Sequence, residues 1–263
     1  MATLERHTLS INDADIVYRR SGPKEQQAPT LVFLHGAGGS ANAFGLLEKL
    51  ADDHHVIIAD HPGFGESDTP EWLETIHDMA FFYLDVFEAL DLKNIHLAGQ
   101  SLGGWIAMEI AVRSTARISR LTLCGAAGIN LPDVPMGDLF SWDKETRYRT
   151  MIFHKDLAEK LLAIPSSPEQ DAMAAKNEAT TRKLSWEPRF NDPDLHKWLH
   201  RITVPTHIIW GSHDPVFPLP YGEKLKDLIP GAAISVIEEC GHLPQVDAPG
   251  ALKALISAEL TAA

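Results

Sequence analysis

Five side chains of the types used in nucleophilic and acid–base chemistry each follow directly after a short apolar run of this 263-residue chain. A serine hydroxyl is a poor nucleophile near neutral pH unless a base lies within hydrogen-bond reach. Imidazole is the most common such base, and a carboxylate can orient it. All three residue types are present at comparable positions, namely His35, Asp60, Ser101, Asp214 and His242.

Ser101 lies in the sequence Gly99-Gln100-Ser101-Leu102-Gly103, which has the form Gly-x-Ser-x-Gly. An apolar run at residues 94–98 precedes this sequence, and a helical pattern from 103 to about 113 follows it. This context favours a nucleophile elbow, which is the sharp strand-to-helix turn that exposes a serine hydroxyl. The two glycines flank the turn, where a Cβ would clash with neighbouring backbone. The helix that begins there directs free N–H groups and its positive dipole end towards charge developing near Ser101.

The elements that position these side chains alternate between strands and helices. We expect a hairpin at residues 8–11 and 16–20, followed by strands at 30–34, 56–59, 94–98, 121–125, 206–210 and 233–237, of which 30–34 and 56–59 have the apolar character of buried strands. Amphipathic helices separate most of these strands, which predicts an α/β fold with a mostly parallel, eight-stranded sheet covered by helices on both faces. Ligands bind at the carboxyl ends of the strands in such sheets, where all five side chains fall.

The alternation breaks after the strand at 121–125, because the next convincing strand begins about eighty residues later. A return helix alone needs roughly a dozen residues or more. Residues 128–200 have mostly helical patterns punctuated by prolines, and we interpret them as a helical cap inserted after the sixth strand. The core domain then comprises residues 1–127 and 201–263.

Composition narrows the possible partners and compartments. The net charge of −13 argues against nucleic acid or an anionic membrane surface as partner, leaving a small molecule. No apolar run approaches membrane-spanning length and the first residues lack a signal region, so a cytoplasmic protein is expected. Two cysteines do not make a disulfide framework, and the 13 histidines show no metal-ligand spacing. We expect neither a metal nor a cofactor, and the sequence does not resolve the oligomeric state.

Taken together, five motifs resemble those of the α/β-hydrolase superfamily. They occur in the nucleophile–acid–histidine order of that superfamily and cover nearly the whole chain apart from the cap. The resemblance implies a serine hydrolase with a helical cap. The matching segments are His35-Gly36-Ala37-Gly38-Gly39, Asp60-His61-Pro62-Gly63-Phe64-Gly65-Glu66-Ser67, Gly99-Gln100-Ser101-Leu102-Gly103-Gly104, Gly211-Ser212-His213-Asp214-Pro215-Val216-Phe217-Pro218 and Gly241-His242-Leu243-Pro244-Gln245-Val246-Asp247.

By this resemblance, Ser101 is the nucleophile, His242 the base and Asp214 the residue that orients His242. The resemblance also implies an oxyanion hole formed by the backbone N–H groups of Ala37 and Leu102. Asp60 and His35 are expected to be structural, the latter bracing the oxyanion loop.

Serine at position 101 disfavours the dehalogenase and epoxide hydrolase branches of the superfamily, which carry aspartate there. It favours hydrolysis of a carboxylic ester, thioester or lactone. The branch that cleaves carbon–carbon bonds in ring-fission products of aromatic degradation ranks second, because its members usually have tryptophan where this chain has Leu243. A cationic side chain of the cap facing the substrate would favour that branch. The remaining alternative is a non-catalytic small-molecule receptor. Loss of Ser101, Asp214 or His242 would point to that alternative, and all three are present.

Overall fold

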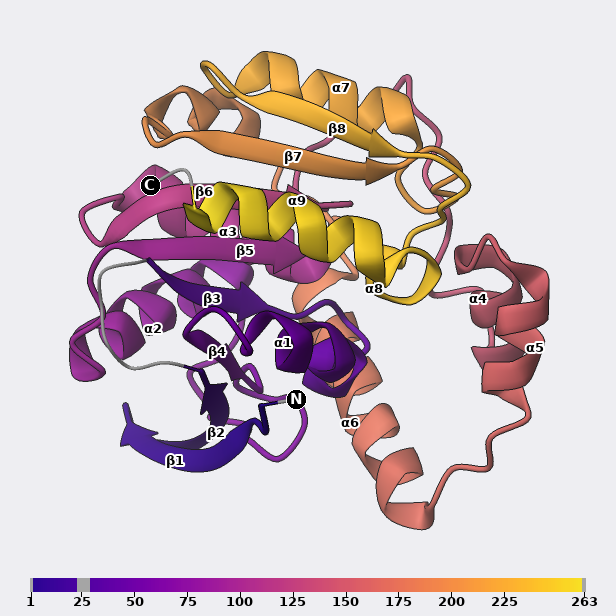
Figure 1. The fold of residues 1–263 in the computed structure, drawn as a ribbon, viewed down its shortest axis with the longest axis horizontal. Helices are drawn as coiled ribbons and strands as arrows, with labels where there is room; N and C mark the ends of the chain where they lie inside the picture. The colour runs from indigo at the N-terminus through magenta and orange to yellow at the C-terminus, as the bar shows by residue number, and fades with distance from the viewer. Residues whose placement is uncertain (1, 23–28, 262–263) are drawn as a thin grey trace.

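A computed structural model describes residues 2–22 and 29–261 of the chain. Eight strands form one sheet in the order β1-β2-β4-β3-β5-β6-β7-β8 (Figure 1). β1 (Glu5–Ile11) and β2 (Ala14–Ser21) form the expected hairpin, and β2 also runs antiparallel to β4 (Val56–Ala59). The remaining pairings are parallel, so the predicted fold class is confirmed.

The parallel strands form the middle and one edge of the sheet. β3 (Thr30–Leu34), β5 (Ile95–Gln100) and β7 (Thr206–Gly211) are buried at every residue, as continuous apolar runs predict for strands covered on both faces. β6 (Ile118–Cys124) lies between β5 and β7, and β8 (Ala233–Ile237) forms the edge.

Two apolar cores flank the sheet because successive side chains of a strand point to opposite faces. One core contains side chains of α2 (Ile76–Ala89), α3 (Leu102–Arg113) and α7 (Leu219–Leu228). The other contains side chains of α1 (Phe44–Leu50) and α9 (Pro249–Thr261) (Figure 1). The sheet is therefore rigidly held from both sides, which fixes the loops at its carboxyl edge.

Short helices complete the core. η1 (Ser40–Ala43) precedes α1, and α8 (Pro244–Asp247) precedes α9. η2 (Leu195–Lys197) and η3 (Leu199–Arg201) lead into β7. The Arg201 guanidinium donates to the carbonyl of Val112 in α3 at 2.7 Å, so the chain is already in contact with the core here.

Besides η2 and η3, the segment between β6 and β7 contains three α-helices, α4 (Lys144–Met151), α5 (Lys155–Leu162) and α6 (Pro168–Ser185). In Figure 1, α4 and α5 lie side by side beyond the carboxyl ends of the strands, and a connecting stretch leads to α6. Asn177 of α6 donates to the carbonyl of Gly38, in the loop after β3, at 3.4 Å. α6 begins with a capping box between Ser167 and Gln170 and with proline at its first position, a combination that stabilises a helix start.

Candidate active site

Ser101 occupies the sharp turn between β5 and α3, with a φ of +54° and a ψ of −114°. This conformation is unfavourable for a residue with a side chain and is a kind of strain found at functional sites. The flanking glycines are required by close backbone approach. A Cβ on Gly99 would lie 2.2 Å from the carbonyl oxygen of Gly103, and one on Gly103 would lie 2.1 Å from that of Leu34. The elbow predicted from the sequence is therefore present.

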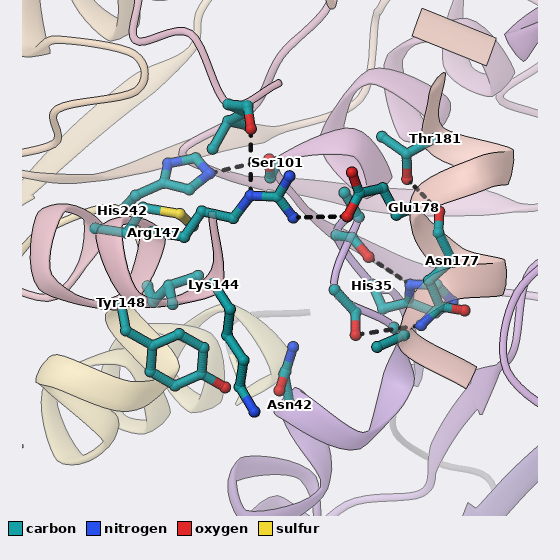
Figure 2. A pocket seen from close by; sticks show the side chains of 18 of the residues that line it. His35, Asn42, Ser101, Lys144, Arg147, Tyr148, Asn177, Glu178, Thr181 and His242 are labelled. Atoms are coloured by element: carbon teal, nitrogen blue, oxygen red, sulfur yellow. Dashed lines mark hydrogen bonds and ion pairs between the residues drawn. The ribbon is translucent and has the colours of Figure 1, made fainter. Parts of the chain in front are cut away.

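The structure brings Ser101, His242 and Asp214 into one hydrogen-bonded line, of which Figure 2 shows the contact between His242 and Ser101. Nε2 of His242 lies 3.0 Å from the Ser101 hydroxyl, and Nδ1 lies 2.8 Å from Oδ2 of Asp214. Asp214 follows β7 and His242 follows β8, so the three side chains come from three loops at the same sheet edge. All three are at most 5% exposed.

The bonds of Asp214 define the state of the imidazole. Its Oδ1 accepts backbone N–H groups from Val216 and Phe217 at 2.8 and 2.9 Å, which fixes the carboxylate and leaves Oδ2 for His242. A carboxylate only accepts, so Nδ1 of His242 donates to Oδ2 and Nε2 is the ring atom that can accept from Ser101. This is the tautomer that can remove a proton from the serine.

The two residues expected to form the oxyanion hole come from two different parts of the fold. Ala37 lies in the loop after β3 and lines the same cavity as Ser101. Leu102 is the first residue of α3, where a helix leaves backbone N–H groups without intrahelical partners.

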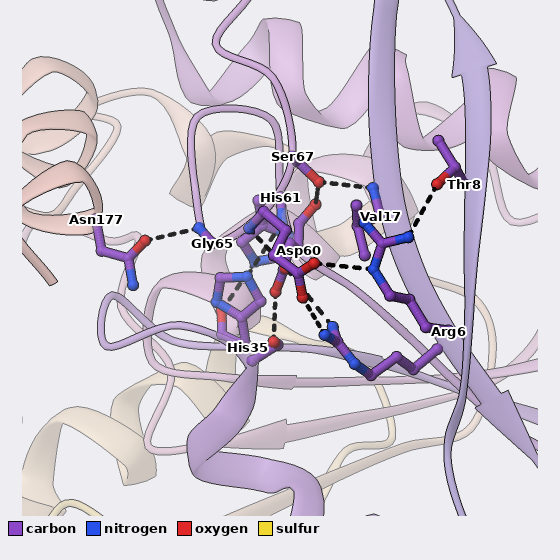
Figure 3. A network of polar contacts seen from close by, with 12 residues as sticks. Arg6, Thr8, Val17, His35, Asp60, His61, Gly65, Ser67 and Asn177 are labelled. Carbon is purple, nitrogen blue, oxygen red and sulfur yellow. Dashed lines mark hydrogen bonds and ion pairs between the residues drawn. The ribbon is translucent and has the colours of Figure 1, made fainter. Parts of the chain in front are cut away.

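A pair of stacked, buried histidines supports the loop after β3, which carries Ala37 (Figure 3). His35 Nδ1 lies 2.7 Å from the carbonyl oxygen of Gly36, and its Nε2 accepts the N–H of His61 at 3.1 Å. His61 Nε2 in turn lies 2.9 Å from the carbonyl oxygen of His35, and its Nδ1 lies 2.5 Å from the hydroxyl of Tyr83. Burial lowers the pKa of both imidazoles, so they act as neutral braces.

Asp60 holds the neighbouring loop rather than facing the serine. Its carboxylate accepts the Ser40 hydroxyl and, at 3.0 Å, the backbone N–H of Glu66, while the Arg19 guanidinium lies 3.7 Å away (Figure 3). Gly65 packs against it so closely that a Cβ there would lie 2.4 Å from the carboxyl carbon. These contacts agree with the structural roles expected for Asp60 and His35.

A cavity of about 910 Å³ opens in front of Ser101 and His242. α4 and α6 of the cap stand on opposite sides of it in Figure 2, with Lys144, Arg147 and Tyr148 on one side and Asn177 and Glu178 on the other. Apolar and aromatic side chains make up much of the remaining wall, including Leu139, Phe140, Trp142, Met151, Ile152, Leu161, Phe190, Leu243 and Val246.

The charged cap side chains in this wall pair with each other. Glu178 lies 3.4 Å from Arg147 and 2.8 Å from Arg182, and hydrogen bonding to Arg182 lowers the pKa of its carboxyl. Arg147 also donates to the carbonyl of Leu139 at 3.2 Å. Asp143 also lines the cavity, so three cationic side chains (Lys144, Arg147 and Arg182) stand against two carboxylates (Asp143 and Glu178), and the wall has an excess of one positive charge.

Within residues 2–22 and 29–261, one group of side chains has metal-ligand spacing, and it lies outside this cavity. His77, Glu109 and Asp192 already form an ion-pair network, in which the contact with Glu109 raises the pKa of His77 to about 9. Arg113 and Trp105 also donate to Glu109. A protonated imidazole cannot ligate a metal, so this network satisfies its own charges.

Several residues at the site were not predicted from the sequence. His61 and Tyr83 brace the loop after β3, and Asn177 accepts the N–H of Gly65 at 2.8 Å from a position 112 residues away. The position of His61 directly after Asp60 at a strand end was the one local signal. Asn177 and Tyr83 lie within helical patterns, where nothing distinguishes them from other helix residues.

Comparison with known proteins decides the family. Residues 31–255 match the family model described as "Alpha/beta hydrolase family". The chain belongs to that family. It is therefore a hydrolase. Among the described residues, no helix is both long and apolar enough to cross a membrane.

The proteins similar to this α/β-hydrolase bear the names of different hydrolases. A 2-hydroxymuconate semialdehyde hydrolase from a Pseudomonas species is 29% identical, with the match covering 82% of this chain and 81% of that protein. Lipase 3 from a Moraxella species is 27% identical, covering 83% and 73%. A crystal structure of a bacterial membrane phospholipase A has a TM-score of 0.79 at 27% identity, covering 98% of this chain and 86% of that one. A meta-cleavage product hydrolase variant, with a TM-score of 0.83 and 98% coverage of both chains, shares the fold at 22% identity.

Proposed function

We propose that this protein hydrolyses a carboxylic ester, thioester or lactone of a small organic molecule through an acyl-enzyme on Ser101. The observation that carries the proposal is the hydrogen-bonded line from Ser101 through His242 to Asp214, with distances of 3.0 and 2.8 Å. It is the arrangement that turns a serine hydroxyl into a nucleophile. No cofactor is needed for this chemistry.

In the first half-reaction, Nε2 of His242 takes the hydroxyl proton as the Ser101 oxygen bonds to the substrate carbonyl carbon. The negative charge that develops on the carbonyl oxygen is received by the N–H groups of Ala37 and Leu102. One such donor changes a rate by about 10²- to 10³-fold. The imidazolium then protonates the leaving alkoxide, and the carbon–oxygen bond of the ester breaks.

In the second half-reaction, a water molecule gives its proton to His242 and attacks the acyl carbon. Collapse of this second tetrahedral intermediate returns the proton to the Ser101 oxygen and releases the acid. Asp214 stabilises the imidazolium in both halves without becoming protonated. Because Oδ1 of Asp214 is held by two backbone N–H groups, the carboxylate keeps its orientation throughout.

A second candidate is cleavage of a carbon–carbon bond in a ring-fission product that carries a carboxylate. Lys144, Arg147 and Arg182 in the cavity wall favour it, since an excess of positive charge on the cap attracts an anionic substrate. The 29% identical semialdehyde hydrolase also supports it. Leu243, in place of the bulky tryptophan usual in that branch, keeps it second to ester hydrolysis.

A substrate panel separates the two candidates. We expect turnover of short p-nitrophenyl esters or lactones at a rate well above that of a vinylogous diketone acid, with no turnover by the Ser101→Ala variant. Faster carbon–carbon cleavage of the diketone acid would reverse the order, and turnover of esters that survives in Ser101→Ala would overturn the assignment of the nucleophile.

A further inference from the structure

The loop that carries His242 contains a second acidic side chain, which the line from Ser101 to Asp214 does not use. Asp247 lies at the end of α8, five residues after His242. Its Oδ2 accepts the backbone N–H of Gly241 at 2.8 Å and that of Phe153 at 2.9 Å. Its Oδ1 lies 3.1 Å from the same Phe153 nitrogen and 3.2 Å from that of His154. We refer to this carboxylate and the three N–H groups as the Asp247 clamp.

The clamp joins the core to the cap. Phe153 and His154 form the turn between α4 and α5, whereas Gly241 directly precedes His242. A further hydrogen bond runs in the opposite direction, from the N–H of His242 to the carbonyl of Met151 at 2.9 Å. The approach is so close that a Cβ on Gly241 would lie 2.1 Å from that carbonyl oxygen.

The backbone of His242 is therefore held at several points. Its own N–H is bound to Met151, the preceding N–H to Asp247, and its carbonyl oxygen accepts the amide of Gln100 at 3.3 Å. One of these anchors, the bond to Met151, comes directly from the end of α4, and the carboxylate that provides a second is itself bound by the N–H groups of the α4–α5 turn. The clamp borders the cavity on both sides. The cavity is lined by Met151 and Ile152 from the α4–α5 side and by Leu243 and Val246 from the His242 side.

A carboxylate is the chemical group this position requires. Several N–H donors converge on two oxygens, and hydrogen bonds to an ionised acceptor are roughly twice as strong as neutral ones. Asparagine would offer one acceptor oxygen and turn its own amide hydrogens towards N–H groups, which leaves donors unpaired.

We propose that Asp247 is a positioning residue for His242, which aligns the imidazole with Ser101 by fixing the Gly241–His242 backbone against the α4–α5 turn of the cap. The inference rests on the proposed role of His242 as the base. It assigns the cap a part in the alignment of the base in addition to enclosing the substrate. A displacement of about 1 Å in such a group costs roughly 10²-fold in rate.

The test compares Asp247→Asn with Asp227→Asn, which removes the same charge from an exposed position in α7. Active sites are counted by the burst of p-nitrophenol released from p-nitrophenyl acetate, so the rate refers to folded, competent enzyme. For Asp247→Asn we expect kcat per active site to fall about 10- to 100-fold with little change in KM. Asp247→Glu, which keeps both oxygens, should recover most of the rate, and Asp227→Asn should match the wild type.

Hydrogen exchange gives a readout that does not depend on activity. In Asp247→Asn, amide protection should fall together in peptides covering residues 151–157 and 238–243. A Gly241→Ala variant, which forces Met151 away, should show the same loss and the same fall in kcat. An unchanged kcat per active site in Asp247→Asn, with a lower melting temperature alone, would overturn the proposal and leave Asp247 purely structural.

The same data distinguish this inference from the proposed function. If the wild type hydrolyses no ester but the two peptides still lose protection together, the function is wrong and the clamp is real as structure. If the wild type hydrolyses esters and neither rate nor protection changes in Asp247→Asn, the clamp is wrong and the function stands.

Discussion

The core and the cap hold their polar side chains in different ways. In the core, Ser101, Asp214 and His242 are at most 5% exposed and are hydrogen-bonded in series. In the cap, Arg147 and Glu178 are 29% and 40% exposed and bond to neighbours within the cap. The first set has one geometry, because each polar atom has a partner fixed by a strand end or a backbone N–H. The second set can exchange partners, because exposed ion pairs are weak and compete with water. The comparison suggests that the core sets the chemistry and the cap sets the choice of substrate. The Asp247 clamp is the place where the two meet.

The strongest way to break this comparison is Ser101→Ala. If the core alone carries the chemistry, kcat for p-nitrophenyl acetate should fall by about 10⁶-fold, the size seen when a comparable nucleophile is removed. Circular dichroism should show an unchanged fold. A loss of only a few-fold would mean that the reaction is carried elsewhere.

Asp214→Asn should have the next largest effect. The amide can present hydrogens to Nδ1 of His242 and favour the tautomer that cannot take the serine proton, so we expect a fall in kcat of about 10⁴-fold. KM for the same ester should change little, since Asp214 does not line the cavity. A main effect on KM would contradict the division between core and cap.

The stability of the core should depend on pH through its buried histidines. Burial lowers the pKa of His96 from 6.5 to about 3 and lowers those of His35 and His61. Below pH 6.5 the unfolded chain therefore binds more protons than the folded protein does. The contribution of these histidines to the free energy of unfolding is fully present above pH 6.5 and is lost as the pH falls. Each such histidine contributes a slope of at most about 1.4 kcal/mol per pH unit in the free energy of unfolding.

Urea unfolding between pH 7 and 4 measures that slope, and His96→Gln should flatten it. His196→Gln, at an exposed position in η2, controls for the loss of an imidazole. Equal flattening in both variants would show that burial is not the cause.

Substitution in the cap should have the smallest effect. Arg147→Met removes an ion pair whose side chains are 29% and 40% exposed, which is worth at most about 1 kcal/mol or roughly fivefold. We expect KM for esters bearing a carboxylate to rise by at most about fivefold, while kcat for neutral esters stays nearly unchanged. A thousandfold fall in kcat for neutral esters would place Arg147 in the chemistry.

Much of the core could be predicted because its signals are local. The strands at residues 30–34, 56–59 and 233–237 match the structure to the residue, since a continuous apolar run between turn residues has few alternatives. Their places after strand ends selected five side chains, and the resemblance to α/β-hydrolases singled out Ser101, Asp214 and His242 among them. In a parallel sheet these places lie along one edge.

The parts that could not be predicted depend on contacts between distant segments. Asn177 reaches Gly65 across 112 residues, and Asp247 reaches Phe153 across 94. Neither pairing leaves a trace in periodicity or composition. α6 is polar on most of its surface, so its pattern predicts a helix without showing which side faces the cavity.

Covalent labelling with a fluorophosphonate, followed by mass spectrometry of the digested protein, tests the central claim most directly. The reagent reacts with serines activated by a neighbouring base. The account predicts one adduct per chain, on Ser101, formed rapidly in the wild type and absent from Ser101→Ala. An unlabelled wild-type protein, or an adduct on a different residue, would contradict it.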